Sequence, residues 1–242
     1  MVATSTGWDA EQAITVVIPV LNDAAALASV LPALPTADRT VEIIVVDGGD
    51  ASDRALDALR ERHSGVRWMQ AATGRGTQMN HGARHAHGRW LVFLHSDTRL
   101  GVGWIDVLRR LDEQTRIVGG SFRFALDSPA HWARWIEWGV SIRVRLFDLA
   151  YGDQALFVRR TVFEELGGYR ELPLMEDVDF IRRLRRHGRL EHASVPALTS
   201  ARRWERDGWF LRTVDNAMLV TLFLAGYPPE SLARHYHRRA RR

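Results

Sequence analysis

The sequence predicts an α/β protein built on a mixed, mostly parallel central sheet with helices on both faces. Through the first hundred residues, short apolar runs alternate with amphipathic segments, which is the pattern of consecutive strand–helix units. After Gly101 the alternation loosens, but strand-like and helix-like segments continue. The chain has 242 residues, of which 46% are hydrophobic, so it can bury one sizeable core. We therefore expect a single domain over residues 1–242.

The elements of the first half follow from the period of the apolar residues and from the turn residues between them. Apolar runs predict buried strands, and the amphipathic stretches between them predict helices. Pro19 ends the first strand because proline cannot donate to a central ladder, and Asn22 or Asp23 can cap the next helix. Strands are expected at residues 14–20, 41–46, 66–70 and 90–94, and helices at 24–34, 52–62 and 77–86.

The second half mixes elements in a way that commonly builds the other wall of a cleft. Helices are expected at residues 104–111 and 131–149 and from Asp177 onward, with strands at 117–125 and 155–158. Trp132, Trp135 and Trp138 follow one another at three-residue spacing on the 131–149 helix. Such aromatic stripes are usually core, which we expect here, with a sugar-stacking wall or an interfacial contact as the alternatives.

The C-terminal residues 206–242 are expected to be helical. The apolar stretch 217–225 is too short to cross a bilayer, which needs about 20 apolar residues, so it predicts a core or interfacial helix. The arginine-rich tail 233–242 is expected to be frayed and solvated, with an approach to anionic lipid as the alternative.

Composition excludes several kinds of chemistry. The chain has no cysteine and no lysine, which excludes thiol catalysis, zinc–thiolate sites, Schiff bases and P-loop lysine chemistry. The net charge of +4 is modest, so we expect no nucleic-acid partner. The first residues lack the apolar segment of a secretory signal, and we expect a cytoplasmic protein.

Two acidic motifs are the most informative features. The apolar run 91–94 leads to Asp97, which predicts a buried strand that delivers a carboxylate to the rim of the sheet, where open α/β folds bind ligands. Asp97 is therefore a metal-ligand candidate. Glu176 and Asp177 precede an amphipathic stretch, where the positive end of a helix dipole favours ionised carboxylates, so Asp177 is the candidate base. The alternative is that these acids merely form turns and begin helices.

The loops after the second and third strands are the expected nucleotide contacts. The second strand ends in Asp47-Gly48-Gly49, a carboxylate followed by two glycines that permit close backbone approach. An acid there can accept from a uracil imide or from a ribose hydroxyl. The third strand leads into the segment 73–80, Thr-Gly-Arg-Gly-Thr-Gln-Met-Asn, whose glycines and helix start can meet a nucleotide and whose arginine can meet a phosphate or base.

An ordered set of motifs over residues 13 to 205 resembles the family 2 inverting glycosyltransferases of GT-A fold. The motifs are Val-Ile-Pro-Val-Leu-Asn-Asp, Val-Val-Asp-Gly-Gly, Gly-Arg-Gly-x-Gln-Met-Asn-x-Gly-Ala, Leu-His-Ser-Asp-Thr, Tyr-Gly-Asp-Gln and Met-Glu-Asp-Val-Asp-Phe. The Gln-Met-Asn, His-Ser-Asp-Thr and Gly-Asp-Gln variants are most similar to a subgroup described as radical-SAM/selenodomain-associated glycosyltransferases, which is linked to arsenosugar synthesis.

The resemblance implies roles for particular residues. Asp97 matches the last acid of the Asp-x-Asp motif, which holds a divalent metal, Mn or Mg, on the donor diphosphate, and His95 replaces the first acid. Asp177 matches the acceptor-activating base, and the segment 200–204 resembles the Gln-x-x-Arg-Trp motif with serine first. The implied nucleotide-binding residues are Pro19, Asn22, Asp23, Asp47, Gly48, Gly49, Gly74, Arg75, Asn80, Ser96 and Arg203. The implied acceptor-binding residues are Gly152, Asp153, Gln154, Glu176 and Trp204.

The expected function is metal-dependent, inverting transfer of a sugar from a nucleotide-diphosphate sugar, expected to be UDP-linked, to a small-molecule or lipid-linked acceptor. Residues 13–100 would form the nucleotide-binding half and residues 101–205 the acceptor and catalytic half. One alternative is a sugar-phosphate nucleotidyltransferase, which usually shows an early glycine-rich loop with arginine and lysine. The other is a non-catalytic nucleotide-binding or membrane-surface module, which would not need Asp47, Asp97 and Asp177 together. For the location, peripheral contact with the inner membrane face is the alternative to a freely cytoplasmic protein.

Overall fold

A computed structural model describes residues 13–49 and 54–240, and in this part of the chain eight strands form one sheet. The strands are β1 (Ile14–Val20), β2 (Val41–Asp47), β3 (Arg67–Gln70), β4 (Trp90–Phe93), β5 (Thr98–Leu100), β6 (Ile117–Asp127), β7 (Leu156–Arg159) and β8 (Arg189–Ser200). Their order is β3-β2-β1-β4-β7-β6-β8-β5. β1 to β4 are mutually parallel, β6 is parallel to β8, and β5 and β7 are antiparallel to their neighbours. The predicted mixed, mostly parallel sheet is confirmed.

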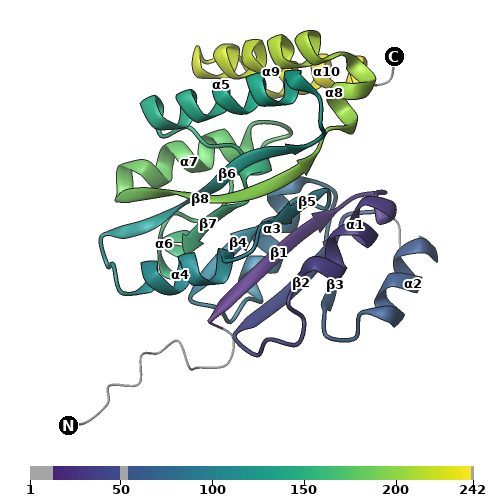
Figure 1. Cartoon of the computed structure of the whole chain (residues 1–242), viewed down its shortest axis with the longest axis vertical. Coiled ribbons are helices and arrows are strands. Elements are labelled where there is room, and N and C mark those ends of the chain that lie inside the picture. The colour runs from purple at the N-terminus through teal and green to yellow at the C-terminus, as the bar shows by residue number, and fades with distance from the viewer. Residues whose placement is uncertain (1–12, 50–53, 241–242) are drawn as a thin grey trace.

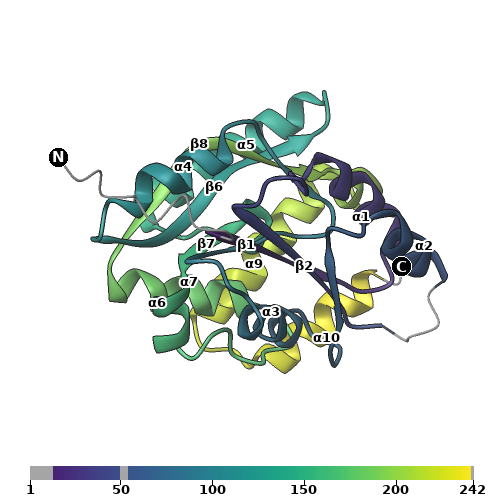
Figure 2. The same ribbon diagram turned by 90° about the horizontal axis from the view of Figure 1, so that it is seen from below.

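Helices cover both faces of this sheet, as expected (Figure 2). They are α1 (Ala24–Val30), α2 (Arg54–Arg62), α3 (Arg75–Arg84), α4 (Trp104–Asp112), α5 (His131–Phe147), α6 (Arg160–Glu165), α7 (Glu176–His187), α8 (Arg202–Asp207), α9 (Trp209–Leu224) and α10 (Pro229–Ala240), with short 3₁₀ turns η2 (Leu31–Ala33) and η3 (Gly152–Gln154). Apolar residues of α1, α2 and α4 share one core with the sheet, and those of α3, α6 and α7 share the core of the other face.

The strand order places a crevice at the carboxyl ends of β1 and β4. The chain passes from β1 to β2 on one side, whereas β4 pairs with β1 on the other side, so the loops that follow β1 and β4 diverge. Ligands of open α/β sheets bind at such a switch point. Asp47 ends β2, and Asp97 follows β4 immediately before β5. The predicted functional residues of the first half therefore gather at this edge.

Pro19 lies inside β1, where the sequence predicted it to end the strand. It stands opposite Val46 in the β1–β2 pairing. The carbonyl oxygen of Val17 accepts from Leu94 on the β4 side, and Val20 accepts from Gly48 on the β2 side. Because alternate residues of a strand bond to alternate sides, the missing N–H of Pro19 faces β4, where the ladder has already ended at Phe93. The proline therefore costs the sheet no hydrogen bond.

Two expectations for the second half were wrong. Trp132, Trp135 and Trp138 are not core residues, since their exposed fractions are 58%, 66% and 61%. The arginine-rich tail is not frayed over its described part, because α10 extends to Ala240 and buries Leu232. The sequence also gave no sign of β8, which pairs with β6 on one side and with β5 on the other.

Candidate active site

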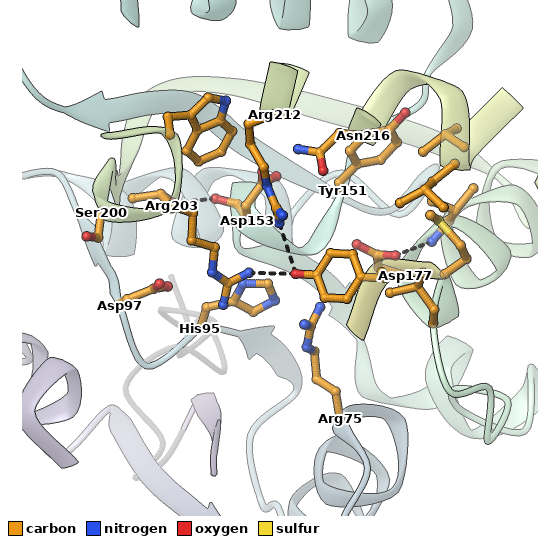
Figure 3. A pocket seen from close by; sticks show the side chains of 18 residues that line it. Arg75, His95, Asp97, Tyr151, Asp153, Asp177, Ser200, Arg203, Arg212 and Asn216 are labelled. Atoms are coloured by element: carbon orange, nitrogen blue, oxygen red, sulfur yellow. Dashed lines mark hydrogen bonds between the residues drawn. The ribbon is translucent and has the colours of Figure 1, made fainter. Parts of the chain in front are cut away.

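A pocket opens where the loop after β4, the start of α7 and the C-terminal helices meet (Figure 3). Its wall combines segments that are far apart in the sequence, from α3 to α10. The charged and aromatic residues that line it are Arg75, His95, Asp97, Tyr151, Asp153, Asp177, Arg203, Trp204, Arg212 and Tyr236. The structure therefore brings the predicted metal ligand, the predicted base and part of the predicted acceptor loop into one pocket.

Asp177 lies at the start of α7, and both of its carboxylate oxygens are held. Oδ2 accepts from the backbone N–H of Gly152 at 2.7 Å, and Oδ1 accepts from the N–H of Val178 at 2.8 Å. A carboxylate has about four acceptor positions, so these two bonds orient the group and leave lone pairs that face the pocket. The positive end of the α7 dipole lies beside this carboxylate.

Gly152 allows η3 to approach this carboxylate closely. A Cβ atom at this position would lie 2.7 Å from His95 Nε2 and 3.2 Å from Asp177 Oδ2. Any residue with a side chain at this position would therefore displace His95 or Asp177. Burial, followed by the charges of Arg75 and Arg203, lowers the pKa of His95 well below its usual value. The imidazole is therefore neutral and can accept or donate a hydrogen bond.

Asp153 is an uncompensated acid in the pocket. Its Oδ1 atom is buried and has no hydrogen-bond partner. Burial raises the pKa of Asp153 to about 6, with the charges of Asp177 and Asp97 adding to the effect and that of Arg143 opposing it. The Arg143 guanidinium lies 3.4 Å from the centre of the Tyr151 ring, which holds the segment before η3 against α5. A carboxyl group in this state is suited to contact a polar ligand.

Three guanidinium groups give one side of the pocket a positive charge. Arg75 pairs with buried Glu176 at 3.2 Å, while Arg203 and Arg212 donate to the hydroxyl of Tyr236 at 3.3 Å and 2.9 Å (Figure 3). Burial raises the pKa of Tyr236, but the charges and hydrogen bonding of the two arginines outweigh it, so the pKa is lowered. Preorganised guanidinium groups of this kind stabilise phosphate charge.

Asp97 and Asp23 are bridged by one arginine. Arg202 of α8 donates to both carboxylate oxygens of Asp23 and to Asp97 Oδ2 at 3.3 Å. Asp23 is the N-cap residue of α1, but its side chain makes no capping hydrogen bond. Helix capping, which the sequence allowed as the role of Asp23, is therefore not what its side chain does here. The bridge connects the end of β1 with the pocket.

The donor set for a divalent cation is small. Among the described residues no three His, Asp or Glu side chains are grouped as a metal site. Asp97 is the carboxylate at the strand end that reaches the pocket. The neutral imidazole of His95 and the side chain of Asp153 also line the pocket. Mg²⁺ is commonly held by one or two carboxylates together with substrate phosphates. The residues present therefore fit a cation that takes most of its oxygen ligands from a bound diphosphate.

The predicted nucleoside-binding residues form a second group, at the carboxyl ends of β1 and β2. Asp47 is buried, and its Oδ1 accepts from the N–H of Gly49 at 2.8 Å. Gly48 packs on the side chain of Gln78, which donates to the carbonyl oxygens of Val20 and Val46. This packing leaves no room for a Cβ at position 48, since the nearest Gln78 atoms would be 2.7 Å away. The turn is thereby held in place.

Several predicted site residues do not line the pocket. The side-chain amide of Asn80 bonds to both backbone groups of Tyr169, and that of Gln154 accepts from Arg143 and donates to Phe122. Glu176 lies behind Arg75, nearly fully buried. The predicted residues outside the pocket wall are Pro19, Asn22, Asp23, Asp47, Gly48, Gly49, Gly74, Asn80, Ser96, Gly152, Gln154 and Glu176.

Four polar residues of the C-terminal helices, at or beside the pocket, were not predicted. Arg202, Arg212, Asn216 and Tyr236 come from α8, α9 and α10. Arg212 carried a weak signal, because a charge inside a mostly apolar helix is usually paired or functional. Tyr236 carried none, since its place depends on how α10 folds back.

The model of the family described as Glycosyl transferase family 2 matches residues 15–167. The chain belongs to this family. Glycosyltransferases as a class transfer a sugar from a donor to an acceptor. This membership favours the first of the three function classes over the nucleotidyltransferase and the non-catalytic module. A search of curated proteins finds no match to the sequence.

Among solved structures, this family 2 glycosyltransferase resembles S. aureus TarS. The structure of TarS 1-349 in complex with UDP-GlcNAc is 15% identical, with a TM-score of 0.56, over 77% of this chain and 58% of that one. A longer TarS structure is 14% identical, with a TM-score of 0.54, over 90% and 41%. A further structure of TarS 1-349 is 16% identical, with a TM-score of 0.55, over 90% and 68%. The chain therefore spans about half the length of the first two. At these identities the likeness shows the shared GT-A fold.

Proposed function

We propose that this glycosyltransferase uses a UDP-linked donor and a divalent cation, and that it inverts the anomeric centre with Asp177 as the base. The observation that carries the proposal is the fixed Asp177 carboxylate, held by two backbone N–H groups in the same pocket as strand-end Asp97. The TarS structure that contains UDP-GlcNAc supports the choice of a uridine nucleotide.

The donor would lie from the β1–β2 edge toward the pocket. The uracil or ribose would meet Asp47, and the diphosphate would meet Asp97, Arg203 and Arg75. A Mn²⁺ or Mg²⁺ ion held by Asp97 would neutralise negative charge on the leaving diphosphate. The guanidinium groups of Arg203 and Arg75 supply positive charge at the same wall, and they need no reorganisation during the reaction.

The transfer step uses Asp177 to accept one proton. The acceptor oxygen attacks the anomeric carbon from the face opposite the diphosphate, and its proton passes to the Asp177 carboxylate. The new carbon–oxygen bond forms as the bond to the diphosphate breaks, and the nucleoside diphosphate leaves with the electron pair. The configuration inverts, and no covalent sugar–enzyme intermediate forms. Asp153, ionised above a pKa of about 6, would accept a hydrogen bond from the acceptor.

A donor panel scored by nucleotide release identifies the base and the sugar, after which Asp177→Asn tests the mechanism. The substitution keeps the shape of the side chain and removes its basicity. We expect UDP affinity to stay near that of the wild type while single-turnover transfer falls by about 10²–10⁴-fold. The control is Asp106→Asn, on the exposed face of α4, which should change neither quantity. If Asp177→Asn transfers sugar to a neutral hydroxyl at the wild-type rate, the base is another group, such as Asp153 or Glu176.

We also propose that the protein belongs to the radical-SAM/selenodomain-associated subgroup of this family. This assignment is supported by the motifs at Gln78–Asn80, His95–Thr98 and Gly152–Gln154. A cytoplasmic location, peripheral at the inner membrane face, belongs to the same proposal.

A further inference from the structure

The exposed apolar side chains of the described residues gather on two neighbouring helices. Of fourteen large apolar side chains that are exposed, six lie on α5 and five on α9. We call them the α5–α9 surface: Trp132, Trp135, Trp138, Ile142, Leu146, Phe147, Phe210, Leu211, Val214, Met218 and Leu224. Figure 1 shows α5 and α9 together at the end of the molecule farthest from α2 and β3. Scattered apolar residues are normal, but a concentration of this kind marks an interaction surface.

The exposed charges on α5 and α9 themselves are positive. Both charged residues of α9, Arg212 and Asp215, are buried, so its exposed face carries no charge. The one acid of α5, Glu137, is also buried and accepts from the backbone N–H of Leu126. Arg134 and Arg145 of the same helix are exposed, and Arg134 pairs with Glu137 at 2.9 Å. The surface therefore combines apolar side chains with cations and has no exposed acid on either helix.

A groove leads from this surface to the active site. It is a cavity of about 690 Å³ between α5 and α9, with a largely apolar lining that includes Trp135, Ile136 and Phe210. Tyr151, Asp153, Trp204, Asn216 and Val220 line both this groove and the active-site pocket. A small polar acceptor needs no apolar channel of this size, whereas an amphiphilic acceptor would fill it with its apolar chain.

The groove is also positively charged. Arg143, Arg182 and Arg185 line it, and the acid in its lining is Asp153, at the end shared with the active site. Arg182 makes no ion pair or hydrogen bond within the described part of the chain. A groove with apolar walls, three guanidinium groups and one inner carboxyl group is complementary to an anionic amphiphile.

We propose that the α5–α9 surface docks on an anionic membrane and that the groove holds the hydrocarbon chain of a lipid acceptor, whose nucleophilic oxygen reaches Asp177. The inference rests on the proposed function and names the acceptor class of that same site. No helix in the described residues is long and apolar enough to cross a membrane. In the proposed complex the surface lies on the bilayer, with its tryptophans at the headgroup level and its arginines toward anionic lipid.

Vesicle flotation of the full chain tests the docking surface without any turnover. Wild type should float with vesicles of equal parts phosphatidylcholine and phosphatidylglycerol, and much less with phosphatidylcholine alone. The double substitution Trp135→Ser and Phe210→Ser should lower the partition coefficient by roughly tenfold or more per side chain. Val102→Ser is the matched control, because Val102 is a fully exposed apolar residue away from this surface, and it should leave flotation unchanged. Equal flotation of the double variant, or dissociation of a dimer by it, would overturn the proposal.

The groove is tested at Gly139, which lines it and has open space where a Cβ would be. Gly139→Trp should fill the groove, while Gly139→Ala is the control. Calorimetry with dodecyl phosphate and ethyl phosphate below micelle concentration should show at least tenfold tighter binding of the long chain to wild type and to Gly139→Ala. Gly139→Trp should lose this preference. An equal affinity for both probes in wild type would refute the lipid-binding groove.

UDP binding, measured in every variant, separates the two proposals. If wild type binds UDP but binds dodecyl phosphate no more tightly than ethyl phosphate, the lipid-acceptor proposal fails and the proposed function stands. Absence of UDP binding in wild type, with lipid preference intact, contradicts the proposed function and leaves the groove assignment standing.

Discussion

The partly buried side chain of Asp153 should make the protein less stable as its carboxyl group ionises. Its Oδ1 atom is out of contact with water and has no hydrogen-bond partner, and burial raises its pKa from an ordinary 3.8 to about 6. Between these two values the folded state binds more protons than the unfolded state. Stability therefore falls as the pH rises through this window, and the loss is complete above the pKa of the folded state.

The size of the effect follows from the two pKa values. They differ by about two units, and each unit corresponds to about 1.4 kcal/mol, so the ionised carboxylate costs about 3 kcal/mol. Asp153→Asn removes the titration and keeps the shape. We expect this variant to be more stable than the wild type by up to about 3 kcal/mol at neutral pH, and by little at about pH 4.

Urea unfolding at both pH values measures this difference, with single-turnover transfer measured on the same proteins. Asp106→Asn is the control, because this acid is exposed on α4 and pairs with Arg109 at the surface. The control should shift stability by less than about 0.5 kcal/mol at either pH. If Asp153→Asn is no more stable than the wild type at neutral pH, or gains equally at both pH values, Asp153 is not a buried acid with a raised pKa. A gain in stability with a loss of transfer is the expected combination.

Three further results are expected at the site. Asp97→Ala should remove the enhancement of UDP binding by Mn²⁺ or Mg²⁺, and calorimetry that shows unchanged enhancement would reject Asp97 as the ligand. Asp47→Ala should weaken binding of uridine itself by about 1 to 3 kcal/mol, because a buried imide N–H loses its acceptor; equal UDP affinity would show that Asp47 only shapes the turn. Gly152→Ala should lower kcat with little change in UDP affinity, because the new Cβ would lie 2.7 Å from His95 Nε2 and displace the loop that orients Asp177; an unchanged kcat would contradict this.

Local pattern was sufficient to predict most of the first half. The strands at 14–20, 41–47 and 90–93 lie where the apolar runs placed them, because each consecutive strand–helix unit buries a continuous apolar strand under an amphipathic helix. That Asp97 and Asp177 lie in one pocket could also be predicted from local pattern. Each stands at the end of an element whose direction the pattern already determines, so the edge of the sheet that it reaches was predictable.

The C-terminal side of the site depended on contacts that no local pattern contains. β8 has no clean alternation of buried and exposed residues, and the pairing of Thr98 with Thr199 joins residues far apart in the chain. Arg202 reaches Asp23, and Tyr236 reaches Arg203 and Arg212, because of where α8 and α10 pack.

The tryptophans of α5 show the same division between sequence and tertiary structure. Their spacing determined that they share one face of a helix, but period alone cannot distinguish a face that meets a core from a face that meets solvent. The sheet covers the face of α5 that carries Ala133 and Val144, so the tryptophans remain exposed beside α9. Sequence thus determined the elements and the chemistry of their ends, whereas long-range packing decided which faces and which arginines reach the site.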